Sequence, residues 1–217
     1  MLLQISNLKK SYGSLLVLKG VNLNVEKSEV ISIVGKSGAG KTTLLHIIGT
    51  LDKADSGNVL FEGNDITKFN QKQLSEFRNK KIGFIFQFHN LLPEFTTLEN
   101  VCIPAFIAKR SKKDAEKRAK ELLEFLGLEN RLHHKPAALS GGEQQRVAVA
   151  RALINNPSMI LADEPSGNLD TQNANDLHHL FFKLRDEFKQ TFIIVTHNIE
   201  LANMADRKLT IEDGVFV

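Results

Sequence analysis

A glycine-rich loop between two apolar segments constrains this chain more than any other feature. The mostly apolar residues Val30–Val34 predict a buried strand, and Leu44–Gly49 predicts a helix. Between them, Gly35–Thr42 fits the pattern G-x-x-x-x-G-K-[ST]. Glycines let backbone N–H groups turn toward a polyphosphate without Cβ clashes, and the following helix directs its positive dipole end at the same anion.

The loop predicts a nucleoside triphosphate site with two roles already assigned. Lys41 is placed to reach the β- and γ-phosphates, and the Thr42 hydroxyl is placed to hold Mg²⁺. A glycine-rich turn could fit this pattern by chance. The strand before the loop and the helix after it favour the phosphate-binding interpretation.

Length and composition limit the other classes of function. The chain has 217 residues, which suits one large domain or one domain with an inserted lobe. Its net charge of +3 does not favour a nucleic-acid binder. The single cysteine, Cys102, excludes an internal disulfide and agrees with a reducing cytosol. We find no signal peptide or membrane-spanning run, so we expect another chain to supply any spanning part.

A second apolar segment ends in two carboxylates. Met159–Ala162 predicts a strand buried on both faces, and Asp163 and Glu164 follow it directly. Open α/β sheets bind ligands at this end of their strands, and carboxylates there are costly without a cation. We expect Asp163 to hold Mg²⁺ and Glu164 to act as general base toward the attacking water. The alternative is an ordinary strand that ends in surface acids.

Histidines fall into two groups. His197 follows the predicted buried strand Thr191–Val195, where a contact with a γ-phosphate is favoured over a structural role. The pairs His133-His134 and His178-His179 lack the spacing and the neighbouring cysteines of a metal site, so we assign them to the surface.

A helix start near residue 140 combines a strong cap with weak helix formers. Ser140 and Glu143 form a capping box, which needs no function to explain it. Gly141 and Gly142 weaken the first turn, which is reasonable if a phosphate must approach their N–H groups closely.

The order of these segments predicts an α/β fold. We expect a mostly parallel sheet around the loop, further strands in the first thirty residues, and a small helical lobe inserted at about residues 89–136. The basic stretch from Lys109 to Lys120 is interpreted as a solvated helix face, with contact to membrane headgroups as the alternative. A terminal hairpin is expected to turn at Asp213-Gly214.

Two further features of the sequence each allow two interpretations. Tyr12, the only tyrosine, either covers a sheet edge or offers a flat face to a nucleobase. The apolar residues Leu91, Leu92 and Phe95 either pack the lobe onto the body or dock a short helix of a membrane partner.

With these residues in place, the whole chain resembles the ATP-binding subunits of ABC transporters. The matching segments are Tyr12 at the adenine-stacking position, Gly35–Thr42 and Met159–Asp163 as Walker A and B, Gln87 as the Q-loop glutamine, Leu139–Glu143 as the LSGGE signature, Ser166–Asp170 as the D-loop and His197 as the switch histidine. The resemblance implies a single domain: a P-loop NTPase core with an N-terminal antiparallel β subdomain (residues 1–88 and 137–217), a helical subdomain at about residues 89–136 and a signature helix from residue 139.

The resemblance also implies the remaining site residues and the partners. It assigns catalysis to Glu164, His197, Gln87 and Lys41, and Mg²⁺ binding to Thr42, Gln87 and Asp163. ATP would contact Tyr12, Gly35, Lys36, Ser37, Gly38, Ala39, Gly40, Lys41, Thr42 and Thr43, and would contact Ser140, Gly141 and Gly142 of a second copy.

Within the family, Phe86–Val101 and Glu164–Asp170 resemble the ATPases of lipoprotein-releasing complexes, although Ser166 stands where that group usually has threonine. We therefore expect integral membrane partners and a place at the cytoplasmic face of a bacterial inner membrane. MacB-type exporters and the FtsE cell-division regulator carry similar segments and remain alternatives.

Overall fold

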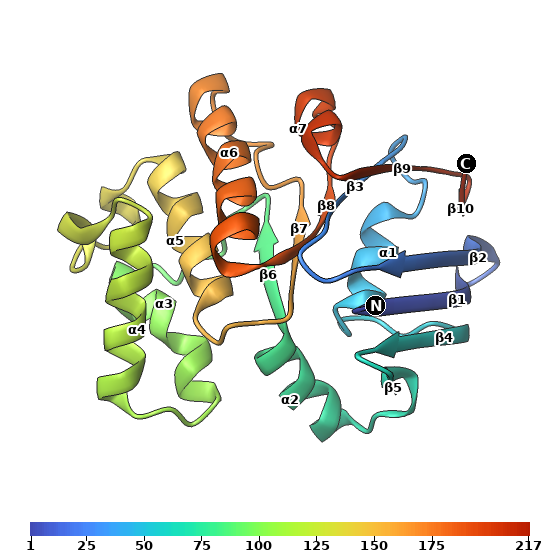
Figure 1. The fold of residues 1–217 in the computed structure, drawn as a ribbon, viewed down its shortest axis with the longest axis horizontal. Coiled ribbons are helices and arrows are strands. Elements are labelled where there is room, and N and C mark those ends of the chain that lie inside the picture. The colour runs from blue at the N-terminus through green and yellow to red at the C-terminus, as the bar shows by residue number, and fades with distance from the viewer.

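A six-stranded sheet runs through the middle of the molecule in the computed structural model, which describes residues 1–217 (Figure 1). Its strands are β3 (Val30–Val34), β6 (Ile82–Phe86), β7 (Met159–Asp163), β8 (Thr191–Val195), β9 (Arg207–Glu212) and β10 (Val215–Phe216), in the order β10-β9-β3-β8-β7-β6. All neighbouring pairs are parallel except β9 with β10. The central strands β7 and β8 are buried on both faces, as parallel strands covered on two sides are.

A smaller antiparallel sheet covers one side of this layer. It consists of β1 (Leu3–Tyr12), β2 (Leu15–Val25), β4 (Ser56–Phe61) and β5 (Asn64–Asp65), in the order β2-β1-β4-β5. Helix α1 (Lys41–Ile48) lies between the two sheets, and one apolar core joins α1, the antiparallel sheet and one face of the parallel strands.

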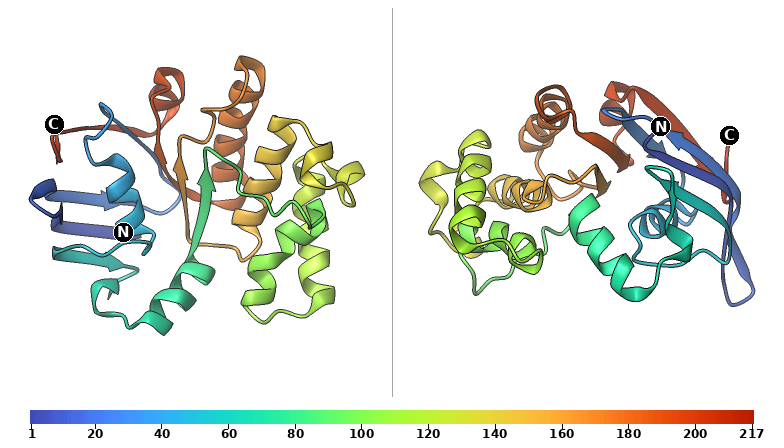
Figure 2. Two further views of the ribbon diagram at one scale, coloured as in Figure 1. Left: turned by 180° about the vertical axis from the view of Figure 1, so that it is seen from behind. Right: turned by 60° about the horizontal axis from the view of Figure 1, so that its bottom comes forward.

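Helices cover the opposite face and build the lobe. They are α3 (Thr97–Ile107), α4 (Lys112–Phe125), α5 (Gly141–Leu153) and α6 (Thr171–Phe188), and they share a second core with alternate residues of β7 and β8. The lobe and the antiparallel sheet lie at opposite ends of the molecule (Figure 2). Helices α2 (Gln71–Lys81) and α7 (Ile199–Met204) and three short 3₁₀ turns, Ile66–Lys68, Glu129–Arg131 and Pro136–Ala138, complete the fold.

The predicted α/β fold class is confirmed, and so are several local predictions. The hairpin of β9 and β10 turns at Asp213 and Gly214, which both have positive φ. Ala115 and Ala119 are buried while Lys113, Lys117 and Lys120 are exposed, so α4 has a core face and a solvated face. No helix is long and apolar enough to cross a bilayer.

Candidate active site

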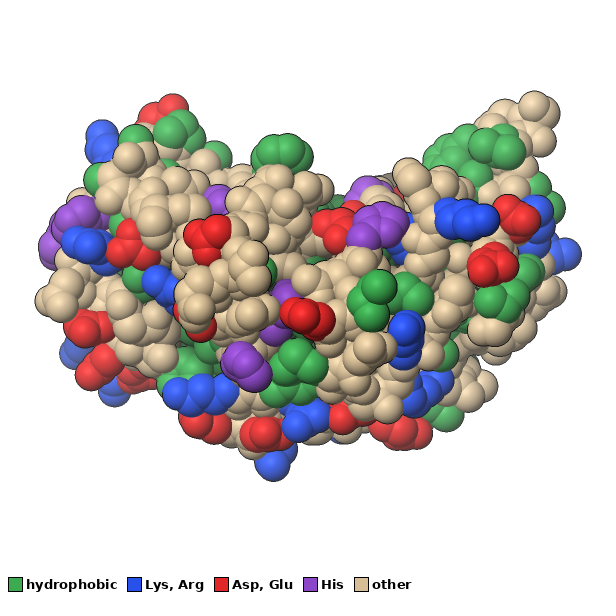
Figure 3. Space-filling model, turned by 90° about the horizontal axis from the view of Figure 1, so that it is seen from above, with side chains coloured by type: hydrophobic (Ala, Val, Ile, Leu, Met, Phe, Trp, Pro, Cys, Tyr) green, Lys and Arg blue, Asp and Glu red, His purple; other side chains and the backbone are tan.

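Most of the predicted site residues converge at one edge of the parallel sheet. The carboxyl ends of β3, β7 and β8 open there, and acidic and histidine side chains lie close together on this face (Figure 3). A cavity of about 380 Å³ is lined by Tyr12, Leu15, Val17, Ser37, Gly38, Gly40, Lys41, Thr42, Thr43, Asp163, Glu164, Val195 and His197. The topology therefore brings together residues that are up to 185 positions apart in the sequence, from Tyr12 to His197.

The start of α1 is a ready anion site. Gly40 caps the helix in the left-handed conformation, with φ of 103°, and no side chain bonds the first-turn N–H groups. The first turn carries no acidic residue. Free N–H groups and the positive end of the helix dipole therefore face the cavity, which fits a phosphate.

Lys41 is buried beside this loop and bonds to it. Its Nζ donates to the backbone oxygens of Gly35 at 2.8 Å and Lys36 at 2.9 Å. A buried ammonium with only carbonyl partners has no compensating negative charge, so a phosphate is a stronger partner for it. When a phosphate binds, the Lys41 ammonium needs only to exchange these carbonyl acceptors for phosphate oxygens, without leaving the loop.

Thr42 and Asp163, two of the residues predicted to hold magnesium, bring two oxygen atoms together in this cavity. The Thr42 hydroxyl lies 3.4 Å from Oδ1 of Asp163, although 121 positions separate the two residues. The chain contains no group of three or more histidine, cysteine or carboxylate side chains that could hold a metal alone. This donor set fits Mg²⁺, which binds through few protein oxygens together with phosphates and water.

Glu164 has the geometry of a general base. Its backbone has φ of 47°, a left-handed conformation that is costly for glutamate and typical of functional sites. Its Oε2 accepts the backbone N–H of His197 at 3.1 Å. Its Oε1 is buried without a hydrogen-bond partner and lies 3.4 Å from Nε2 of His197. An unpaired carboxylate oxygen in a polar cavity is suited to bind a water molecule.

Tyr12 lies in the wall of the same cavity. The residue is 49% exposed, so its ring is accessible on the side of the phosphate loop. This position favours the nucleobase platform over the interpretation that it covers a sheet edge.

The Ser140 turn lies outside this cavity. The predicted capping box is present: Oγ of Ser140 accepts the N–H of Glu143, and Oε2 of Glu143 accepts the N–H of Ser140 at 2.8 Å. Gly141 is exposed, and a Cβ added to it would make only an ordinary contact with Leu169 at 3.7 Å, whereas a Cβ on Gly142 would overlap the side chain of Asn173 on α6. Close packing is therefore a second reason for Gly142, independent of any phosphate.

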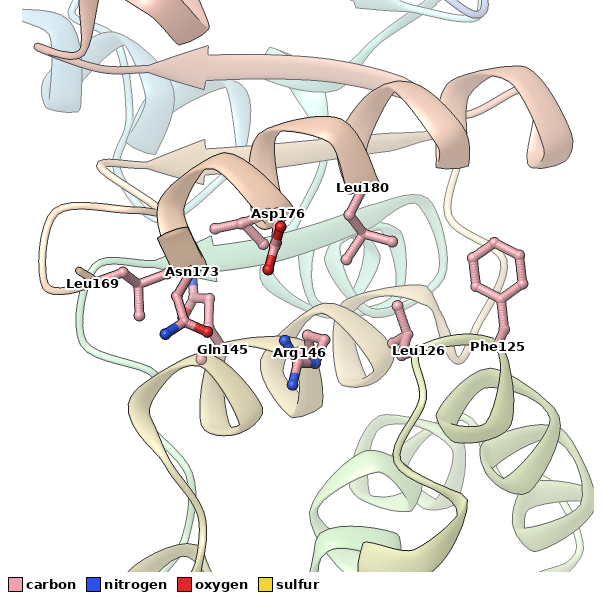
Figure 4. A pocket seen from close by; sticks show the side chains of 10 residues that line it. Phe125, Leu126, Gln145, Arg146, Leu169, Asn173, Asp176 and Leu180 are labelled. Atoms are coloured by element: carbon pink, nitrogen blue, oxygen red, sulfur yellow. The ribbon is translucent and has the colours of Figure 1, made fainter. Parts of the chain in front are cut away.

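A small pocket lies behind this turn, between the lobe and the body. Gln145 and Arg146 of α5 face Asn173 and Asp176 of α6, and Phe125 and Leu126 close the far end (Figure 4). The Gly142 contact with Asn173 is at the near end of this pocket, on the side of Ser140.

Gln87 does not line the cavity. Its amide donates to Oδ1 of Asn168 at 3.1 Å, and the Asn168 amide donates back to the Gln87 carbonyl at 3.2 Å. Gln87 is thereby tied to the turn that follows Glu164, and it comes directly after Phe86, which pairs with Asp163 in the parallel sheet. Asn168 belongs to the predicted D-loop, but the sequence patterns did not indicate its bond to Gln87.

The assignment of His178 to the surface is wrong. Its side chain is 1% exposed, and its Nε2 lies 3.0 Å from Oγ of Ser166 in the turn after Glu164. Burial lowers the pKa of His178 from its ordinary value, which favours the neutral ring. Of the other three, His133 and His179 are exposed and His134 is partly buried.

Comparisons with known proteins agree with this geometry. A family model described as "ABC transporter" matches residues 18–167. The dimeric structure of MJ0796, a bacterial ABC transporter cassette, is 42% identical, covers 99% of this chain and 96% of the cassette, and has a TM-score of 0.89. A second structure of that cassette, a post-hydrolysis state bound to ADP and Pi, matches equally well. The chain belongs to the ABC transporter family, and the resemblance drawn from its motifs is confirmed.

Within the family, the similar proteins have one name in common. The lipoprotein-releasing system ATP-binding protein LolD of Cytophaga hutchinsonii is 60% identical over 216 residues, covering 100% of this chain and 99% of the relative. LolD of Bacteroides thetaiotaomicron is 61% identical over 213 residues, with 98% of each chain covered. The similarity is therefore to ATP-binding subunits of the LolD type, as Phe86–Val101 and Glu164–Asp170 indicated.

Proposed function

We propose that this chain binds and hydrolyses ATP to energise a membrane transporter that releases lipoproteins from the inner membrane. The observation that carries the proposal is the meeting of the phosphate loop, Asp163, Glu164 and His197 in one cavity. The LolD relatives supply the lipoprotein part, because their similarity covers almost the whole of both chains.

The loop and two oxygen ligands would hold the phosphates and the metal. Loop N–H groups and Lys41 would bind the phosphate oxygens, while Thr42 and Asp163 would hold Mg²⁺. Bound Mg²⁺ supplies charge stabilisation as phosphoryl transfer proceeds. The protein contributes position and electrostatics, which is most of what this reaction requires.

Glu164 accepts the proton of the attacking water at Oε1. His197 fixes the carboxylate through its backbone N–H, and its ring lies beside the same oxygen. The partly buried carboxylate is thereby held in one orientation, which lowers the cost of placing the water.

One chain holds half of each site. Ser140 is an exposed cap at the start of α5, and it lies outside the cavity that holds Lys41 and Glu164. We infer that Ser140, Gly141 and Gly142 contact the nucleotide of a second copy, whose γ-phosphate lies against the N-terminal dipole of α5. The dimeric cassettes of the same family support this arrangement. ATP closes such a dimer and ADP does not, because only ATP has the γ-phosphate.

The membrane partners are of the LolC and LolE kind, and they place the chain at the cytoplasmic face of the inner membrane. Their docking segment is the one after Gln87, where Phe88, Leu92 and Phe95 are exposed by 70%, 43% and 41%. Leu91 instead packs against the core of the lobe, so the packing interpretation is favoured for that residue alone. Gln87 bonds to Asn168, which provides a direct connection from this segment to the Glu164 turn.

Glu164→Gln tests the catalytic assignment. The variant should bind ATP as the wild type does and hydrolyse it at least about 100-fold more slowly, because it loses the proton acceptor. Glu200→Gln, which changes an exposed acid outside the cavity, is the matched control and should keep the wild-type rate. An unchanged steady-state rate in Glu164→Gln would refute the assignment.

Leu92→Glu and Phe95→Glu test the docking segment. Both variants should keep ATP binding and lose co-purification with the membrane partners, which are identified by mass spectrometry of the wild-type complex. Val217→Glu, at another exposed apolar residue, should co-purify normally. If the partners remain bound to both lobe variants, the docking assignment is wrong; if the recovered partners are not a pair of integral membrane proteins, the lipoprotein-release assignment is wrong.

A further inference from the structure

The ring of Tyr12 is held by two charged residues, Lys10 and Asp52, on the side away from the cavity. Its hydroxyl donates to Oδ2 of Asp52 at 2.5 Å. The ammonium of Lys10 lies 4.9 Å from the ring centroid and donates to Oδ1 of Asp52 at 2.9 Å. Lys10 also donates to the Lys53 carbonyl at 2.7 Å, so the cluster is joined to the backbone as well.

This cluster connects the ring to the phosphate loop. Asp52 follows α1, and the backbone N–H groups of Leu51 and Asp52 both donate to the carbonyl of His46 near the end of that helix. The opposite end of α1 is the phosphate site at Gly40 and Lys41. One short rigid helix therefore sets the position of Asp52 relative to the phosphates.

The electrostatics of the cluster favour this arrangement. The hydrogen bond to Asp52 is the main reason that the pKa values of both Tyr12 and Lys10 lie above their ordinary values. Burial opposes ionisation of Asp52, but the bonds from Tyr12 and Lys10 outweigh it and lower its pKa. At neutral pH the cluster is an ammonium, a carboxylate and a neutral phenol, each with its partner.

We propose that Lys10 and Asp52 are positioning residues that hold the Tyr12 ring ready to stack on the nucleobase of the bound nucleotide. The proposal rests on the proposed nucleotide function, and it explains how the chain gains affinity for the nucleobase. Lys10 covers one face of the ring, and the face toward the cavity stays free. Since the hydroxyl is engaged by Asp52, the ring contributes stacking and no hydrogen bond to the base edge, so it recognises an aromatic base without selecting among bases.

Fixing the ring in advance raises affinity because less side-chain freedom is lost on binding. Without Asp52, the phenol would swing about χ1 in an exposed position and would have to be ordered by the ligand. Ordering one such side chain corresponds to a change in Kd of about three- to tenfold. The effect is confined to ligands that carry a base.

The test compares ATP with inorganic tripolyphosphate, both with Mg²⁺, by calorimetric titration. Asp52→Ala and Tyr12→Phe should weaken ATP binding about three- to tenfold and leave tripolyphosphate binding unchanged. Asp52→Asn keeps the shape and an acceptor oxygen for the hydroxyl, so it should retain most of the ATP affinity. Asp55→Asn changes a charge 3.9 Å from Lys10 without touching the ring and should alter neither ligand.

The outcomes separate this proposal from the nucleotide function. Equal weakening of both ligands in Asp52→Ala would mean general damage to α1 and would overturn the positioning role, as would unchanged binding of both. If the wild type binds ATP no better than tripolyphosphate, the ring does not stack and the proposal fails while the phosphate site stands. If the wild type binds neither ligand, the nucleotide function itself is wrong.

Discussion

Replacing Gly35, the first glycine of the phosphate loop, by alanine should destabilise the fold by an amount that its packing allows us to estimate. Gly35 has φ of 152°, and a Cβ added to it would overlap the backbone oxygen of Ile211 and lie 3.2 Å from Cγ2 of that residue. Ile211 belongs to β9, which pairs with β3, so no side-chain rotation relieves the overlap. The strained φ costs alanine about 1–2 kcal/mol, and forced separation of packed strands adds about 1–3 kcal/mol.

Gly38→Ala is the matched control in the same loop. Gly38 has φ of 80°, but nothing lies within 4 Å of its added Cβ, so only the conformational strain remains. Gly35→Ala should therefore be less stable than Gly38→Ala by about 1–3 kcal/mol. In thermal unfolding without nucleotide this is an additional fall in Tm of roughly 2–4 °C per kcal/mol. Equal Tm values for the two variants would refute the packing argument for Gly35.

Two further predictions concern charge. Lys41→Ala should lose most affinity for ATP because the loop keeps its N–H groups but loses its only buried ammonium, and a nucleotide titration with the wild-type Kd would contradict this. His178 should make the protein less stable in acid. Burial lowers its pKa in the folded state, so its stabilising effect is complete above the unfolded value of about 6.5 and is lost as the pH falls below it. The free energy of unfolding should therefore fall more steeply between pH 7 and pH 5 in the wild type than in His178→Phe, and identical slopes would contradict the assignment.

The parallel layer of the fold is well predicted because its signals are local. Buried parallel strands are continuous apolar runs, and each is followed by a polar residue at the edge where the ligand binds. Val30–Val34, Met159–Asp163 and Thr191–Val195 were therefore identified with their functional neighbours, and the observed register confirms that these strands pair. The Ser140 capping box has a spacing of three residues and is equally visible in the sequence.

The contacts between distant segments could not be predicted in the same way. Nothing near Tyr12 indicates Asp52, because their bond depends on how α1 packs between two sheets. The left-handed backbone of Glu164 arises from the turn it begins and has no sequence signature. His178 is different, since it lies three residues before Phe181 on the buried face of α6. This helical spacing could have indicated its burial, although the sequence analysis assigned it to the surface.

We propose that a complete ATP site needs two copies of the chain. Analytical ultracentrifugation of Glu164→Gln tests it directly, because this variant hydrolyses ATP slowly and the bound ATP remains intact during the measurement. We expect a monomer in ADP, a dimer in ATP, and a monomer in ATP once Ser140→Arg is added, with the ATP affinity of the single chain unchanged. A doubly substituted protein that still dimerises in ATP would contradict the shared site.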